Sequence, residues 1–210
     1  MKTGIHSSLR QVIRNLILET ACNGATAKIQ QGLDEIERLN LNVEVKQQGA
    51  RGYDVILRDG TQIVGLFQVS TPPDYCKSTY VTEWTEVDSS LENTGIGAVL
   101  YDVAIEYATK LGSYLTCDRL SVSDEAKRMW RYYNRSDDYE VLQLDTESGQ
   151  FTPDKWDDCR QETFHKEWYR EPIGSKSYRE EFIASPFTKA YRKKRTTTIP
   201  CLGDRYIESE

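Results

Sequence analysis

The sequence has little of the residues that build metal sites and histidine-dependent active sites. Only two of its 210 residues are histidines, His6 and His165, and they lie far apart with no H-E-x-x-H context. The five cysteines are scattered and form no C-x-x-C pair, so neither a disulfide framework nor a zinc knuckle is expected. Metal catalysis and histidine triads have little to build from, and we predict no metal ligands.

Long hydrophobic runs and a signal-peptide pattern are also missing. The apolar segments fall far short of the ~20 residues that cross a bilayer, and no charged n-region, apolar h-region and cleavage site open the sequence. We therefore expect no membrane span and no secretion, and the scattered cysteines favour a reducing compartment such as the cytoplasm. The net charge of −6 argues against general nucleic-acid binding by the whole body.

The first 40 residues predict a pair of amphipathic helices. Apolar residues recur at helical spacing in HSSLRQVIRNLILETA (6–21) and again over residues 26–39. Because the two apolar stripes match, we expect the first helix to pack on the second. The alternative is a docking peptide for a protein groove or a membrane surface.

Residues 41–145 predict one α+β domain. Apolar and polar residues alternate, as in β-strands, over 41–47, 53–70 and 80–88, and Asp59-Gly60 predicts a hairpin turn within the second segment. A helix is expected over about 97–111, a strand over 113–118, a helix capped by Ser123 over 123–134, and a strand over 139–145. This order is typical of a mixed, mostly antiparallel sheet flanked by helices.

The tail, residues 146–210, is different in composition. It carries 12 basic and 12 acidic residues, and Ile173 is the only aliphatic residue between Thr146 and Phe182. Such a segment lacks the apolar mass for a core of its own. We therefore predict an extended C-terminal arm that is pinned to its own body or to a neighbouring chain by four aromatic anchors, Trp156, Phe164, Trp168 and Tyr169.

The stretch NTGIGAVLYDVAIEYAT (93–109) places two glycines directly before a strongly periodic helix. A glycine-bracketed helix start lets a ligand, often a phosphate, approach unpaired backbone amides. Gly95-Ile96-Gly97 matches only part of the dinucleotide fingerprint, because Leu100 replaces its third glycine. A tight, well-packed loop is the other interpretation.

The order of elements resembles the GNAT acyltransferase superfamily. In that family a strand ending in valine leads through (R/Q)-x-x-G-x-(G/A) into a helix. Here Val87 precedes Gly95 by eight residues, and the turn continues through Ala98. LTCDRLSVSDEAKRMWRYY (115–133) is similar to the family's second cofactor-contacting segment, with S-x-x-A at Ser123. The resemblance covers roughly residues 50–145.

The resemblance implies a GNAT-like fold that binds acetyl-CoA. The amides of Gly95, Ile96, Gly97 and Ala98 would hold the pyrophosphate. Backbone groups from Trp84 to Val87 would pair with the pantetheine arm as an added strand does.

The chain departs from the family pattern at two positions. Glu92 stands where the family has Arg or Gln, and Trp130 stands where it often has a tyrosine acid. An indole cannot protonate a departing thiolate. Tyr133 is the candidate substitute, and Glu86 or Glu83 is the candidate base. Both glutamates could equally be solvated strand residues.

Three segments also resemble GNAT-like proteins encoded by tailed bacteriophages: SLRQVIRNLILE, LYDVAIEYAT with DRLSVS, and SPFTKAYRKKRTTTI. Some such proteins are carried in virions, so we expect a place in the host cytoplasm and an alternative place in the particle. The basic run 189–195 could contact nucleic acid, although such runs more often pair with the chain's own acids.

These observations lead to two hypotheses. The first is an acetyl-CoA-dependent N-acyltransferase whose amine acceptor attacks the thioester directly. The second is a catalytically silent virion or assembly protein that binds neighbouring subunits through its arm and N-terminal helix. The acceptor and the oligomeric state are not predicted.

Overall fold

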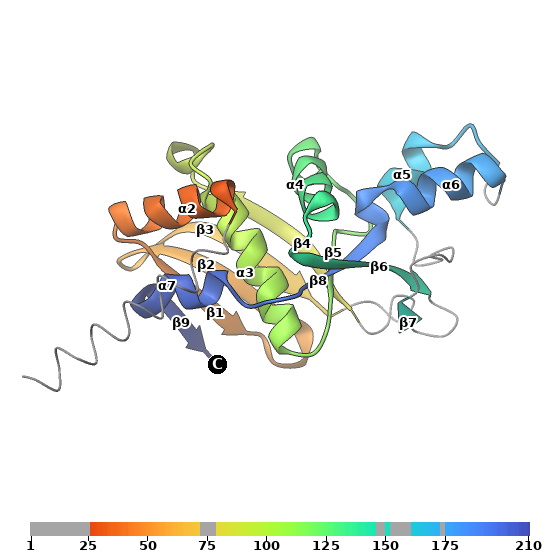
Figure 1. Ribbon diagram of the computed structural model, residues 1–210. Coiled ribbons are helices and arrows are strands. Elements are labelled where there is room, and N and C mark those ends of the chain that lie inside the picture. Colours follow the sequence, from red (N-terminus) through yellow and green to blue (C-terminus); the bar gives the residue numbers. More distant parts are fainter. Residues whose placement is uncertain (1–25, 72–78, 146–149, 152–160, 173–174) are drawn as a thin grey trace, which may run out of the picture.

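The computed structural model describes residues 26–71, 79–145, 150–151, 161–172 and 175–210. Its described strands form one nine-stranded sheet in the order β7-β6-β8-β5-β4-β3-β2-β1-β9 (Figure 1). The strands are β1 (Asn42–Gln47), β2 (Gly52–Asp59), β3 (Gln62–Ser70), β4 (Tyr80–Val87), β5 (Leu115–Thr116), β6 (Tyr139–Asp145), β7 (Gln150–Phe151), β8 (Lys189–Lys193) and β9 (Tyr206–Ser209). Only β4–β5 and β1–β9 pair in parallel, so the predicted mixed, mostly antiparallel α+β fold is confirmed.

Helix α3 forms the centre of the core. The helices are α2 (Ala27–Arg38), α3 (Ile96–Lys110), α4 (Asp124–Arg135), α5 (Glu162–Glu167), α6 (Lys176–Ala184) and α7 (Thr198–Leu202). Helix α3 contacts strands β2 to β5 and β8 as well as α2 and α7, and it is buried from Ala98 to Ala108. This explains why its sequence is apolar on nearly every side rather than along one stripe.

The elements predicted between residues 26 and 145 lie within about three residues of their observed bounds. Ser123 caps α4, because its hydroxyl oxygen accepts a hydrogen bond from the Ala126 N–H at 3.1 Å. The β2–β3 hairpin turns at Gly60 and Thr61, one residue later than expected. Gly60 has a φ of +56°, a conformation that glycine adopts without strain.

The C-terminal tail differs most from its prediction as an extended arm. Strand β8 lies inside the sheet, between β5 and β6, and β9 covers the edge of β1. Lys189 and Lys193, from the basic run, are buried. The sequence pattern did not predict β8, because lysines at both ends of a segment usually indicate an exposed segment. In the structure the Lys189 ammonium group donates to Gln143, and that of Lys193 contacts Asp102 and Glu106.

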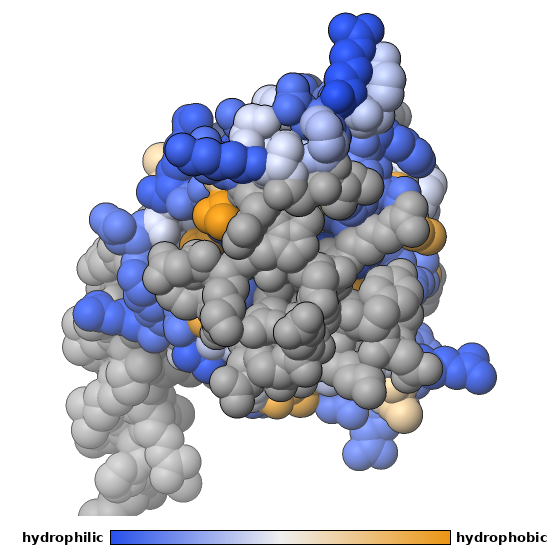
Figure 2. Space-filling model, turned by 90° about the vertical axis from the view of Figure 1, so that its right-hand side faces the viewer, coloured by the Kyte–Doolittle hydropathy of each residue, from blue (hydrophilic) through white to orange (hydrophobic). Residues whose placement is uncertain are grey.

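Residues 161–172 and 175–188 form a small aromatic cluster at the end of the molecule away from α2 (Figure 1). Phe164 is buried, stacks on Trp168 and meets Tyr178 and Phe182 edge to face. Tyr169, expected to be an anchor, is 71% exposed. The coloured surface of this end is mostly hydrophilic (Figure 2).

Some expectations lie outside the described residues. These are the first predicted helix, which falls within residues 1–25, and the proposed aromatic anchor at 156. Cys201 is disulfide-bonded, which the scattered cysteine spacing did not predict, and Cys117 is a buried free thiol.

Candidate functional site

The two glycines before α3 have different surroundings. Gly95 is the N-cap residue with a φ of +90°, a conformation that residues with a side chain rarely adopt. It also packs against α2, since an added Cβ would lie 2.8 Å from the backbone N of Gly32. Gly95 is therefore a glycine for reasons of packing and backbone conformation.

Gly97 is the predicted pyrophosphate-binding residue with open space in front of it. A Cβ atom built there would meet nothing within 4 Å. Ile96 and Ala98 are buried, as is Gly95, whereas Gly97 is partly exposed. A ligand reaching this helix start would approach at Gly97. Glu92, whose carboxylate would repel a phosphate, is exposed three residues before the N-cap residue Gly95.

Strand β4 provides an open backbone edge. Its parallel pairing with β5 covers only Tyr80 and Val81, so the β4 residues that follow have no partner on that side within the described chain. A β-bulge falls at Glu83, where the register with β3 shifts. Because the Asp88 N–H donates to Val64 O of β3, alternation points the N–H groups of Thr85 and Val87 toward the open edge.

A cleft of about 250 Å³ lies along this edge, and we call it the β4–α4 cleft. Strand β4, one α3 side chain, the β5–α4 loop and the start of α4 contribute its walls. The lining residues are Thr82, Glu83, Trp84, Thr85, Tyr101, Asp118, Ser121, Val122, Ser123, Ala126 and Trp130. The S-x-x-A pair, Ser123 and Ala126, therefore faces the same cleft as the strand edge predicted to bind a pantetheine arm.

Trp130 forms part of the wall of this cleft. It is 1% exposed and packs against the rings of Tyr101 and Tyr191, with centroids 5.7 and 4.9 Å away. The cleft remains open beside it. Trp84, by contrast, is 56% exposed at the rim.

The structure does not bring the two predicted catalytic residues into the cleft. Glu86 is exposed on β4, and its carboxylate accepts a hydrogen bond from the Trp84 indole N–H at 3.2 Å. Tyr133 is fully buried and donates its hydroxyl proton to Ala98 O at 3.2 Å. Glu83, the alternative base, does line the cleft.

Sequence reasoning missed Tyr101, which lines the cleft from α3. One signal could have found it, since Tyr101 follows Gly97 by four residues and so shares its helix face. Burial raises the pKa of the Tyr101 hydroxyl to about 12. Burial likewise raises the pKa of the Cys117 thiol, at the end of β5, to about 12. A thiol held protonated in this way is a poor nucleophile.

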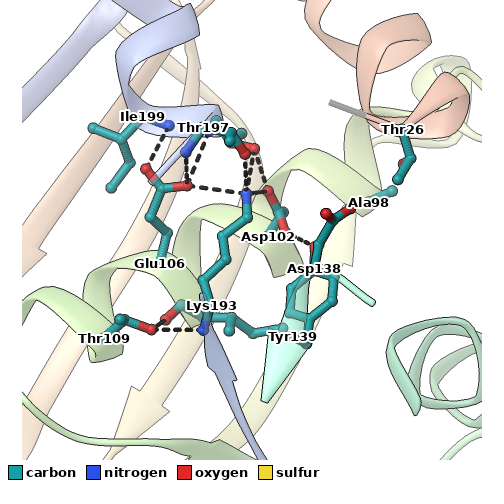
Figure 3. A network of polar contacts seen from close by, with 12 residues as sticks. Thr26, Ala98, Asp102, Glu106, Thr109, Asp138, Tyr139, Lys193, Thr197 and Ile199 are labelled. Carbon is teal, nitrogen blue, oxygen red and sulfur yellow. Dashed lines mark hydrogen bonds and ion pairs between the residues drawn. The ribbon is translucent and has the colours of Figure 1, made fainter. Parts of the chain in front are cut away.

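A buried ionic network joins α3 to β8 and α7 (Figure 3). Lys193 of β8 lies between Asp102 and Glu106, with its Nζ 3.0 Å from a Glu106 oxygen and in direct contact with Asp102. Tyr139 and Thr198 both donate hydroxyl protons to Asp102. Both carboxylates are fully buried, so each depends on these partners.

Glu106 also binds the first turn of α7. Its carboxylate accepts hydrogen bonds from the backbone N–H groups of Thr197, Thr198 and Ile199 at 2.9–3.1 Å. The segment after β8 is thereby held to the middle of α3.

Within the described residues, no helix is long and apolar enough to span a membrane.

No protein-family model and no curated protein matches the chain. Among solved structures it is similar to a candidate GNAT-family acetyltransferase from Desulfovibrio desulfuricans, at 17% identity over 64% of this chain and 82% of that one, with a TM-score of 0.35. A GNAT-family acetyltransferase from Staphylococcus aureus Mu50 matches at 18% identity over 57% and 68%, with a TM-score of 0.31. A transcriptional regulator from Bacillus halodurans C-125 matches at 24% identity over 49% and 65%, with a TM-score of 0.33. At these sequence identities and TM-scores, the similarity assigns no activity to this chain.

Proposed function

We propose that the protein is an N-acyltransferase that moves an acetyl group from acetyl-CoA to an amine. The observation that carries the proposal is the β4–α4 cleft, where an open strand edge faces the start of a helix. Such an edge pairs with amide groups of an extended ligand. The pantetheine arm of acetyl-CoA is extended and contains amides.

The lining of the cleft fits an uncharged arm. Hydroxyl groups, aromatic rings and small side chains form most of its surface, and among the described lining residues only Glu83 and Asp118 are charged. The Asp118 carboxylate already accepts a hydrogen bond from the Leu120 N–H at 2.7 Å. Within the described chain, the N–H groups of Thr85 and Val87 point toward the open edge and would orient the arm.

The phosphates would lie at the first turn of α3. Gly97 leaves room there for a phosphate oxygen to approach the backbone. Lys28 of α2 reaches across to α4, with its Nζ 3.8 Å from the Met129 sulfur, and adds a positive charge between these helices. Glu92 opposes an anion, and its exposure lets it turn into solvent.

The amine would attack the thioester carbonyl directly, without a covalent enzyme intermediate. Glu83 is the strand carboxylate that lines the cleft, so it is better placed than Glu86 to accept the proton of the amine. The bulge at Glu83 turns its side chain out of the regular alternation of β4.

Calorimetric titration with acetyl-CoA tests the proposal. Wild type is expected to bind in the micromolar range. Gly97→Ala places a methyl group in the space through which a phosphate oxygen would approach and should raise the Kd a few-fold. Gly97→Glu places a carboxylate there and should weaken binding by about tenfold or more, because it repels the phosphates. The added carboxylate suits a helix start, so the variant should stay folded.

A second candidate is an assembly protein that keeps this fold without the chemistry, of the kind carried in phage particles. It is favoured by the positions of Glu86 and Tyr133 outside the cleft. A folded protein that gives no heat with acetyl-CoA, and that mass spectrometry finds in purified particles, would support this candidate over the enzyme.

A further inference from the structure

We propose that Tyr101 donates the proton that the departing thiolate takes up during acyl transfer. This inference rests on the proposed function and deepens it, since it names a catalytic residue that the sequence comparison placed elsewhere. It is carried by the position of Tyr101 in the wall of the β4–α4 cleft, where the two parallel strands separate.

Tyr101 is held rigidly in that position. Its ring lies edge to face with Phe67 of β3 at 4.6 Å and with Trp130 of α4 at 5.7 Å, and the residue is 6% exposed. Tyr101 lines the cleft together with Thr85 of β4, and Cys117 at the end of β5 lies near enough to raise the pKa of the Tyr101 hydroxyl. It therefore lies at the fork between β4 and β5, beside the edge that would hold the thioester arm.

The other hydroxyl groups near the cleft already donate or accept hydrogen bonds within the protein, or are too weakly acidic to protonate a thiolate. Thr82 donates to Thr116 O at 3.1 Å, and Ser123 caps α4. Tyr133 donates to Ala98 O from outside the cleft. Among the described lining residues, Tyr101 carries the only phenol. A phenol is the most acidic of these hydroxyl groups, and its pKa of about 12 keeps it protonated at neutral pH.

The proton balance of the step is complete. The amine nitrogen forms a bond to the thioester carbonyl carbon, and the carbon–sulfur bond breaks with its electron pair going to sulfur. Tyr101 gives its hydroxyl proton to that sulfur, which leaves as a free thiol. The phenolate regains a proton from the one that the amine has released, through the base or water.

The first readout requires no turnover. Coenzyme A with a free thiol is bound to wild type, Tyr101→Phe and Tyr133→Phe, and thiolate formation is followed by ultraviolet absorbance as pH rises, with the protein alone as baseline. A hydroxyl that donates to sulfur stabilises the bound thiolate. The thiol pKa should therefore be about one unit higher in Tyr101→Phe than in wild type, and unchanged in Tyr133→Phe.

The second readout is thiol release from acetyl-CoA with a panel of amines. Tyr101→Phe should lower kcat by about 100-fold with KM retained. With an aryl thioester, whose acidic thiol leaves without a proton, the difference between the two proteins should nearly vanish. A purely structural role of the hydroxyl would lower both rates alike.

The outcomes separate the two proposals. If Tyr101→Phe binds coenzyme A with the wild-type thiol pKa, or if the loss in kcat is the same for both thioesters, Tyr101 is not the donor and the transferase proposal stands. If folded wild type does not bind coenzyme A at all, the transferase proposal fails and the role of Tyr101 fails with it.

Discussion

Gly32 of α2 and Gly95 at the start of α3 are in direct backbone contact. A Cβ atom on Gly32 would lie 2.4 Å from the carbonyl oxygen of Gly95, which is far inside van der Waals contact. The two helices can therefore approach each other only because neither residue has a side chain at this point. This contact places the first turn of α3, and with it Gly97, relative to α2.

We expect Gly32→Ala to lower the free energy of unfolding by about 1–3 kcal/mol, because the methyl group meets backbone atoms that must shift. Gly97→Ala, two residues from the contact, should change stability little or raise it by up to about 1 kcal/mol, since alanine favours a helix. Urea denaturation of both variants checks this, and equal stability of the two would contradict the packing role of Gly32.

Lys193→Met should destabilise the fold by about 3–5 kcal/mol, because it leaves Asp102 and Glu106 buried without their cation. Lys194→Met is the matched control, since Lys194 is the next residue in the chain and its side chain is exposed. It should change stability by less than about 0.5 kcal/mol. The two variants are compared by chemical denaturation at neutral pH. Similar small losses in both would show that the network contributes little.

The Cys117 thiol should make stability depend on alkaline pH. Its pKa rises from 9.0 to about 12 in the folded protein, so above pH 9 the thiol ionises in the unfolded chain first. That favours unfolding, and the stabilisation present below pH 9 is lost as pH rises toward 12. Cys117→Ala removes this contribution, so its unfolding free energy should fall by about 1 kcal/mol less than that of wild type between pH 8 and 10. Parallel pH dependences would exclude the buried thiol as a cause.

Glu83→Gln should lower turnover by about 100-fold if Glu83 accepts the amine proton. Glu86→Gln should stay within a few-fold of wild type, because Glu86 is exposed outside the cleft. The measurement is thiol release at several pH values with the best amine found. The reverse order of the two effects would return the role of base to Glu86, and full activity in both variants would assign it to water.

The local elements of residues 26–145 could be predicted because their signals are local. The apolar stripe of α2, the alternation in β2 and β3, and the Ser123 cap each depend on residues a few positions apart. Part of the strand edge predicted from Trp84 to Val87, namely Trp84 and Thr85, lines the same cleft as Ser123 and Ala126. Its position rested on the order of the elements rather than on any single residue.

What the sequence could not indicate depends on contacts between distant segments. Lys193 is a strand residue of the core only because Asp102 and Glu106 lie opposite it, about ninety positions earlier in the chain. Tyr101 and Tyr133 look alike in the sequence, and only the packing of α3 and α4 decides which hydroxyl reaches the cleft. Similarly, Gly95 and Gly97 share one motif, yet α2 covers the first and leaves the second open.

The place of β8 between β5 and β6 has a consequence for biosynthesis. Every described residue that lines the cleft is synthesised about sixty positions or more before Lys189, the first residue of β8. Until that strand is made, β6 has no partner that joins it to the rest of the sheet, and the ionic network lacks its lysine. The nascent chain must wait in a partly assembled state, because contacts between distant segments form late. A chain interrupted before Lys189 would keep each of these lining residues and lack the strand that supports them.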